Sequence, residues 1–217
     1  MGKLVTRLFR LERDLAQRER FDKVGERNLL TSVREEAGTL AMYATHVPDA
    51  PETCYVFEVY AGEDAYQAHA SSPQFKAYVE MAGEVLNGRE VISVKPALLV
   101  EKSEPLEVAG PNDVLPRLAR ITVPPEHDIA FRAAVYANMR QSVQLEDGVL
   151  VMYAATLADD PTRWVFWEVY ANEEAYESHR ETAHFKRYIA ETTDLVSEKE
   201  LLALAADTLA SKGFLRA

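Results

Sequence analysis

The chain has 217 residues and a formal net charge of −11, with apolar and charged fractions ordinary for a globular protein. A chain this acidic offers no basic surface for phosphate groups, which argues against a nucleic-acid partner. The single cysteine, Cys54, excludes an internal disulfide, and no apolar run reaches membrane-spanning length. We therefore expect a cytoplasmic protein without a membrane partner.

The sequence contains an internal repeat with a constant shift of 110 residues. Residues 36–78 and 146–188 are identical at 19 of 43 positions without a gap. The stretch between the two copies is rich in proline, glycine and acidic residues, as exposed linkers are. We predict a first repeat at residues 1–102, a linker at 103–116 and a second repeat at 117–217.

The predicted elements follow the same order in both copies. Each copy opens with a strand-like run, at residues 4–11 and 118–123. Apolar side chains then recur at helical spacing, from residue 21 to 33 in the first copy and from residue 131 to 143 in the second. Each repeat therefore begins with a strand followed by an amphipathic helix.

The next predicted elements are a helix stop and a hairpin. Gly38 and Gly148 follow the helical runs and are natural stops for them. In the first copy two strand-like runs follow, at residues 39–47 and 55–61, joined by a segment rich in turn-forming residues. The second copy repeats this hairpin.

A second helix and a closing strand complete each copy. The helix begins at Glu63 and breaks at Ser72–Pro73, where serine can cap and proline can occupy the first helical position. The closing strand spans residues 91–100; its equivalent, residues 200–206, has helical propensity, but the repeat register places it on the strand. We predict an α+β fold of two βαββαβ units, whose sheets pack face to face as a pseudo-dimer within one chain.

Two polar residues recur on the apolar face of the first helix. Asn28 and Ser32 are four residues apart, and Asn138 and Ser142 repeat both residue types and positions. Polar groups on a buried face need partners. They either bond to neighbouring backbone or water, or they line a pocket.

A histidine and a tyrosine recur on one side of the second helix. Tyr66 precedes His69 by three residues, and Tyr176 precedes His179 in the same way. A neutral imidazole is well suited to proton transfer near pH 7. A buried, hydrogen-bonded structural histidine is the competing interpretation.

A glutamate recurs in the middle of the second hairpin strand. Glu58 and Glu168 stand in otherwise apolar runs, so each carboxylate needs a partner. The histidine of the same copy is one candidate partner, and the contact would fix its tautomer. Without that contact, we expect salt-bridge groups at the sheet surface or in a barrel interior.

Aromatic residues repeated in both copies are the remaining candidates for substrate contacts. They are Tyr43, Tyr153, Phe75 and Phe185. Aromatic side chains at strand and helix spacing usually belong to the core, which is the alternative for each of them. The sequence has no Gly-rich phosphate loop, no paired cysteine motif and no His-Glu-x-x-His, so we expect neither a metal site nor a tightly bound cofactor.

Three motifs resemble the antibiotic biosynthesis monooxygenase domain and its quinol monooxygenase relatives. They are Glu36-x-Gly38-Thr39-Leu40, Phe57-Glu58-Val59-Tyr60 and Ala65-Tyr66-x-Ala68-His69-x-x-Ser72-Pro73-x-Phe75. The second copy repeats them, and the resemblance covers nearly all of both copies. The most specific part is the Ala-Tyr-x-x-His segment with the phenylalanine that follows.

The resemblance implies a ferredoxin-like fold in which two copies in one chain supply the usual homodimer barrel. It also implies a pocket between helices and sheet, and oxidation of a quinol- or anthrone-like aromatic by dioxygen without metal or flavin. His69 and His179 would be the bases, and the Asn28, Asn138, Tyr66 and Tyr176 side chains would orient the substrate or donate to its oxyanion. Further assembly into a homodimer stays open.

Two other functions remain compatible with the sequence. One is a non-catalytic small-ligand-binding or stress-associated protein, in which the repeated polar residues only complete the core. A closed, water-free layer around His69 would favour it. The other is a small-molecule isomerase, since isomerases that resemble this family keep a similar histidine.

Overall fold

The computed structural model describes residues 4–217, which form six α-helices and ten β-strands. The first repeat comprises β1 (Val5–Arg13), α1 (Arg18–Glu35), β2 (Thr39–Val47), β3 (Ala50–Tyr60), α2 (Glu63–Ser71), α3 (Pro73–Val85) and β4 (Leu86–Glu101). The second comprises β6 (Leu115–Thr122), α4 (Asp128–Leu145), β7 (Val149–Leu157), β8 (Arg163–Tyr170), α5 (Glu173–Glu181), α6 (Ala183–Thr192), β9 (Glu198–Ala203) and β10 (Ala205–Ser211). The predicted βαββαβ order is confirmed in both copies.

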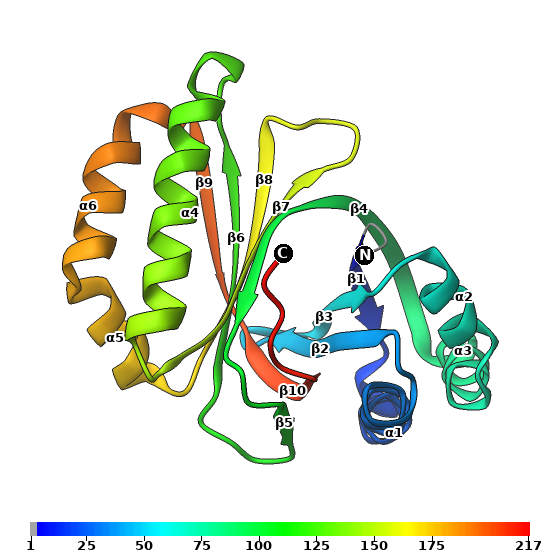
Figure 1. Ribbon diagram of the computed structural model, residues 1–217. Helices are drawn as coiled ribbons and strands as arrows, with labels where there is room; N and C mark the ends of the chain where they lie inside the picture. Colours follow the sequence, from blue (N-terminus) through cyan, green and yellow to red (C-terminus); the bar gives the residue numbers. More distant parts are fainter. Residues whose placement is uncertain (1–3) are drawn as a thin grey trace. The chain divides into compact units, whose positions relative to one another are not determined.

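Each repeat builds an antiparallel sheet with the strand order of a ferredoxin-like fold. The order is β2-β3-β1-β4 in the first repeat and β7-β8-β6-β9 in the second. Figure 1 shows α4, α5 and α6 on one side of the second sheet. The predicted fold class, α+β with two ferredoxin-like repeats, is confirmed. Within residues 4–217, none of the helices has the length and apolarity needed to cross a bilayer.

The break in the second helix has the predicted local cause. Ser72 lies between α2 and α3 and accepts a hydrogen bond from the backbone N–H of Phe75, while Pro73 occupies the first turn. In the second repeat Thr182 accepts from Phe185 in the same way. The same cap therefore sets the angle between the two helix segments in both copies.

The chain forms two compact units that exchange their closing segments. Unit 1 holds the described residues up to Ser93 together with Glu104–Asn112 and Leu204–Gly213; unit 2 holds Val94–Ser103, Asp113–Ala203 and Phe214–Ala217. Residues 86–93 of β4 pair with β1 in unit 1, and residues 94–101 pair with β7 in unit 2. Likewise β9 pairs with β6, whereas β10 pairs with β2.

The segment between the repeats is largely exposed, as predicted, but it is not wholly irregular. Its residues Leu106–Ala109 form β5, which pairs with β10 inside unit 1. The predicted boundaries at residues 102 and 117 stay predictions, because the compact units follow the strand exchange and not the order of the repeats.

The two glycines expected to stop the first helices have a different role. The helices end earlier, at Glu35 and Leu145, and neither glycine has a positive φ. A Cβ on Gly38 would instead collide with the Cβ of Ala65 in α2, and a Cβ on Gly148 with that of Ala175 in α5. These glycines let the loop pass closely over the second helix.

We expect Gly38→Ala and Gly148→Ala each to lower the free energy of unfolding by about 1–3 kcal/mol, because the backbone must move to relieve the overlap. Gly25→Ala in α1 is the matched control: its Cβ meets no atom within 4 Å. The control should gain up to about 1 kcal/mol from helix propensity. Urea unfolding measures all three, and a Gly38→Ala protein as stable as the wild type would contradict the steric argument.

Candidate functional site

Each unit contains a cavity between its helices and its sheet. Cavity 1, in unit 1, has a volume of ≈ 360 Å³, and cavity 2, in unit 2, has ≈ 220 Å³. The wall of cavity 1 includes Phe9, Leu11, Phe21, Asn28, Cys54, Val56, Glu58, Tyr66, Phe75 and Tyr78. The wall of cavity 2 includes Ile121, Val135, Asn138, Met139, Phe166, Glu168, Tyr176, Phe185 and Tyr188.

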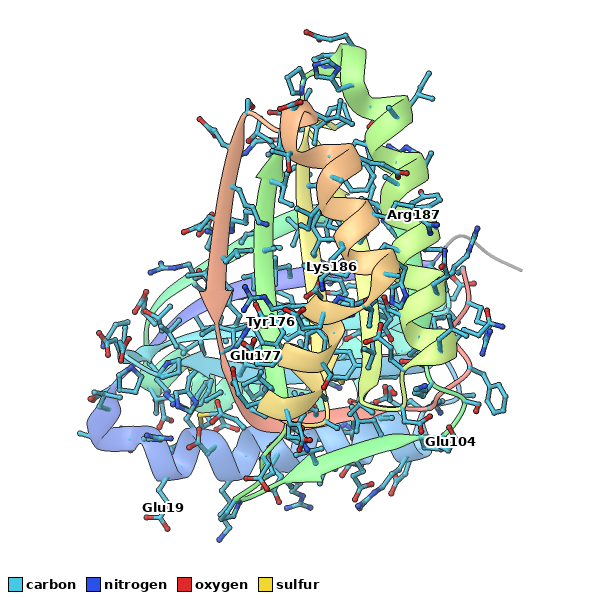
Figure 2. All side chains as sticks on the ribbon, turned by 90° about the vertical axis from the view of Figure 1, so that its left-hand side faces the viewer. Glu19, Glu104, Tyr176, Glu177, Lys186 and Arg187 are labelled. Atoms are coloured by element: carbon cyan, nitrogen blue, oxygen red, sulfur yellow. The ribbon has the colours of Figure 1, made fainter. Side chains whose placement is uncertain are left out.

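The same four predicted site residues lie on the wall in both units. In cavity 1 they are Asn28, Glu58, Tyr66 and Phe75; in cavity 2 they are Asn138, Glu168, Tyr176 and Phe185. Figure 2 shows Tyr176 on α5, in the helix layer in front of the strands of unit 2. The structure thus gathers the amide, carboxylate, phenol and phenyl groups from four separate elements of each repeat.

Glu58 is a buried carboxylate facing cavity 1. Its Oε2 accepts a hydrogen bond of 2.8 Å from the Tyr60 hydroxyl. Burial raises the pKa of Glu58 to about 7, although the Tyr60 hydrogen bond and the charges of Arg7 and Arg89 oppose the shift. A carboxyl group with this pKa exchanges a proton near neutral pH. In unit 2, Glu168 accepts the equivalent bond from Tyr170 at 2.8 Å.

The predicted contact between the histidine and this glutamate is wrong. His69 Nδ1 lies 3.0 Å from Glu36 Oε2, and His179 Nδ1 lies 2.9 Å from Glu146 Oε1. These glutamates follow the first helix at its C-terminal end, so they reach the histidine from the neighbouring helix and not from the sheet. Glu36 and Glu146 occupy equivalent positions in the two repeats. This identity is the sequence signal that could have pointed to them as partners of the histidines.

His69 lies outside the wall of cavity 1. It is fully buried, its ring centroid lies 4.7 Å from that of Phe75, and Phe75 itself lines the cavity. Its Nε2 has no hydrogen-bond partner among residues 4–217. Burial lowers the pKa of His69, and the nearby Glu36 carboxylate only partly offsets this. The imidazole is therefore neutral at pH 7, and it packs against the wall residue Phe75 without lining the cavity itself.

Asn28 presents an unsatisfied polar atom at the wall of cavity 1. The residue is 3% exposed, and its Oδ1 has no hydrogen-bond partner within the described part of the chain. Asn138 Oδ1 is in the same state at cavity 2. An orphaned amide oxygen in an apolar cavity costs free energy unless a ligand or water bonds to it. Asn28 is therefore a candidate hydrogen-bond acceptor for a bound hydroxyl group.

Tyr66 is held by a cation–π contact. The Arg7 guanidinium carbon lies 3.6 Å from the centre of the Tyr66 ring, and Arg7 is the cross-strand neighbour of Glu58. In unit 2 the Arg117 guanidinium lies 4.8 Å from the Tyr176 ring centre. The arginine fixes the tyrosine at the cavity wall and places a positive charge near the carboxylate.

The other predicted substrate contacts lie away from both cavity walls. Ser32 Oγ accepts a hydrogen bond from Gln74, and Ser142 Oγ donates to the Asn138 backbone oxygen at 2.9 Å. The Tyr153 hydroxyl donates to Glu101, and Tyr43 is fully buried in the sheet. For the serines, the interpretation as locally satisfied polar groups fits this geometry better than pocket lining.

Three substitutions make the two cavities unequal. Gly25, Cys54 and Val56 line cavity 1, and the second repeat has Val135, Trp164 and Phe166 at the equivalent positions. The Trp164 and Phe166 rings are stacked, with centroids 5.8 Å apart, and belong to the core of unit 2. Ligand cavities usually measure about 300–1,000 Å³. Cavity 1 falls in this range, and cavity 2 falls below it.

The sequence did not indicate that residues from the far end of the chain line cavity 1. Asp207 and Thr208 come from β10, at the far end of the chain, and reach unit 1 through the strand exchange. Tyr78 also lies on this wall, and Tyr188 is its counterpart in unit 2. Burial raises the pKa of the Tyr78 hydroxyl, so it stays protonated.

Comparison with known families confirms the resemblance seen in the motifs. The family model "Antibiotic biosynthesis monooxygenase" matches residues 5–81 and again residues 117–191. The chain belongs to the antibiotic biosynthesis monooxygenase family. It is a tandem member, with one family domain in each repeat. No curated protein matches the chain.

Solved structures share the fold over nearly the full length of this chain. A structure from Lactobacillus acidophilus, described as a "putative monooxygenase", is 28% identical over 100% of both chains, with a TM-score of 0.94. One from Fusobacterium nucleatum, described in the same way, is 20% identical over 100% of this chain and 98% of its own, with a TM-score of 0.89. An "anthrone oxidase-like protein" is 14% identical over 98% of this chain and 94% of its own, with a TM-score of 0.56. The last two show the shared fold alone.

Proposed function

We propose that cavity 1 is the active site of a cofactor-independent monooxygenase that oxidises a small, uncharged, quinol- or anthrone-like aromatic with dioxygen. The observation that carries this proposal is a carboxyl group with a pKa of about 7 on the wall of a mainly apolar cavity. Such a group can remove a proton from a bound phenol or an activated C–H. Membership of the family supports the reaction class.

The proposed reaction needs only substrate, dioxygen and the residues of the wall. Glu58 removes one proton from the CH₂ group of the substrate, and the delocalised carbanion gives electrons to dioxygen, so that a carbon–oxygen bond forms and the product is a peroxide. Loss of the remaining C–H proton then breaks the O–O bond, the outer oxygen leaves as water with the two protons, and the CH₂ group becomes a C=O group. The amide of Asn28 and the hydroxyl of Tyr66 orient the substrate oxygen.

The charges around cavity 1 favour an uncharged substrate. Besides Glu58, the carboxylates of Asp22, Glu26 and Asp207 contribute to its wall, and Arg89 is the one basic residue among the wall residues described. A substrate carrying its own carboxylate would meet repulsion in this setting. A neutral aromatic ring with hydroxyl groups matches the apolar surfaces and the unsatisfied amide oxygen of Asn28.

The burial of His69 favours a second candidate, a non-catalytic protein that binds a small aromatic ligand. The closed layer around this histidine is what a purely structural role predicts. Catalysis by His69 and His179 stays a prediction, and neither is among the wall residues of cavity 1 or cavity 2. The two candidates share the binding site and differ in whether bound substrate reacts.

We expect the purified chain to consume one dioxygen per molecule of oxidised product when supplied with an anthrone or hydroquinone panel. An oxygen electrode measures the rate, with chelator present, flavin absent and protein-free samples correcting for autoxidation. Titration calorimetry with a non-oxidisable quinone analogue measures binding separately. Binding without oxygen uptake would support the ligand-binding candidate, and the absence of both would overturn the assignment of cavity 1.

A further inference from the structure

The second repeat contains a cluster of one carboxylate and two imidazoles, which we call the Glu-His-His cluster. Glu146 follows α4, His179 lies in the last turn of α5, and His184 lies in the first turn of α6. Glu146 Oε1 lies 2.9 Å from His179 Nδ1 and 2.6 Å from His184 Nε2. One ligand atom from each residue lies within 4.8 Å of the other two.

The first repeat shows which features of this cluster are new. There the equivalent carboxylate, Glu36, accepts a hydrogen bond from the Gln74 amide at 2.6 Å and another from the Thr39 hydroxyl. The second repeat has His184 in place of Gln74 and Val149 in place of Thr39. One change supplies a nitrogen with a lone pair, and the other removes a hydroxyl donor from the carboxylate.

Both changes suit a metal ion better than a hydrogen-bond network. An amide nitrogen cannot ligate a metal through a lone pair, whereas imidazole is a common ligand. A carboxylate oxygen released from a hydroxyl donor can bind a cation. Two imidazoles with one carboxylate are typical of zinc, while Mg²⁺ and Ca²⁺ prefer oxygen ligands.

We propose that Glu146, His179 and His184 bind one Zn²⁺ ion, with water as the fourth ligand. Zinc bonds to these groups measure about 2.0–2.2 Å, which places tetrahedral ligand atoms about 3.3 Å apart. The observed separations of 2.9 and 2.6 Å therefore widen by less than about 1 Å on binding. Rotation of the three side chains can supply this movement.

The cluster is held in place and can be reached by an ion. Thr182 accepts from the Phe185 backbone N–H and donates to the His179 carbonyl oxygen at 2.7 Å, which fixes α6 against α5. The side chains of His184 and Glu146 are 9% and 13% exposed to solvent, so an ion can reach them without unfolding of the helices. None of the three cluster residues is among the wall residues of cavity 2.

A zinc ion at this position would join the ends of three helices in unit 2. Its expected effect is on stability and not on chemistry, because the cluster lies off the cavity wall. The inference is therefore independent of the proposed oxygenation, and it departs from the expectation, based on sequence motifs, that the chain has no metal site. Ligands that unite separate elements stabilise the folded state by mass action.

We expect titration calorimetry of the metal-stripped full chain with ZnCl₂ at pH 7.5 to show one ion per chain and a higher Tm in the presence of zinc. His184→Gln should weaken zinc binding at least about tenfold, and this variant should fold normally because glutamine can donate to Glu146 as Gln74 does to Glu36.

The first repeat provides a gain-of-function test. Combining Gln74→His with Thr39→Val copies the cluster into unit 1 and should raise the stoichiometry to two ions per chain. Absence of zinc binding by the wild type would overturn the proposal. So would undiminished binding by His184→Gln, because the ion would then sit elsewhere on this acidic chain.

Discussion

Glu58→Gln is expected to lower kcat/KM for oxygen uptake by about 10²- to 10⁴-fold, the usual contribution of a general base. Glutamine keeps the shape of the side chain and can still accept the hydrogen bond from the Tyr60 hydroxyl, so the fold and the ligand affinity should survive. Oxygen electrode kinetics and calorimetry with the quinone analogue measure the two properties separately. A variant that binds the analogue and oxidises the substrate at the wild-type rate would sink the assignment.

Two matched variants sharpen this result. Glu168→Gln makes the same change beside the smaller cavity 2 and should leave the rate within about twofold, given a residual effect below about 0.5 kcal/mol. His69→Ala tests the base expected from the family resemblance. If His69→Ala abolishes turnover at unchanged analogue affinity while Glu58→Gln does not, the histidine is the base, and its layer must open during the reaction.

The pH dependence follows from the raised pKa of Glu58. Since the base must be ionised, kcat/KM should rise with pH and level off above a midpoint near 7. Stability should change in the opposite direction. The Glu58 carboxyl stays protonated up to about pH 7 in the folded state, but only up to about pH 4.5 in the unfolded state. The free energy of unfolding is therefore highest below about pH 4.5 and decreases as the pH rises towards 7. Glu58→Gln should gain stability relative to wild type by up to about 3 kcal/mol across that window.

Cys54→Trp is expected to abolish binding in cavity 1 and to lower kcat/KM by more than about 100-fold. The change introduces the side chain that the second repeat carries as Trp164, which fills the same region of unit 2. A binding loss of this size corresponds to about 3 kcal/mol. Because the indole enters an existing cavity of ≈ 360 Å³, the protein should remain folded.

The reciprocal change, Trp164→Cys, separates blockage from damage to the fold. It should cost about 3–5 kcal/mol of stability because it empties a packed core, while oxygen uptake below the melting temperature should be retained. Calorimetry, thermal unfolding and oxygen uptake on both variants decide the matter. Cys54→Trp with normal binding would show that the substrate does not occupy cavity 1.

The cysteine itself has no chemical role in this scheme. Burial raises the pKa of the Cys54 thiol to about 12, so the thiolate is absent at neutral pH. Cys54→Ala should therefore behave like the wild type in oxygen uptake, which makes it the size control for Cys54→Trp.

The helices and strands of each repeat could be predicted because the two aligned repeats give independent sequence patterns for the same element. The 110-residue register placed residues 200–206 on a strand against their helical propensity, and the structure has β9 and β10 there. The register also separated His69, Asn28 and Glu58 from unrepeated neighbours. Local patterns and repetition together were enough for the fold of each repeat.

Contacts that depend on tertiary geometry could not be predicted in the same way. The partner of His69 is Glu36, which follows the C-terminal end of α1 and does not belong to the sheet. Asp207 reaches cavity 1 only because β10 crosses to unit 1. The difference in cavity volume depends on how Trp164 and Phe166 stack, and neither the repeat alignment nor the hydropathy pattern carries that information.

The exchange of closing strands bears on how the two repeats were free to diverge. Since unit 1 uses β10 from the second repeat and unit 2 uses the end of β4 from the first, each repeat is an obligatory component of its neighbour's sheet. The second repeat, with its smaller cavity, Trp164 and the Glu-His-His cluster, is therefore needed for the sheet of unit 1 whatever its own cavity binds.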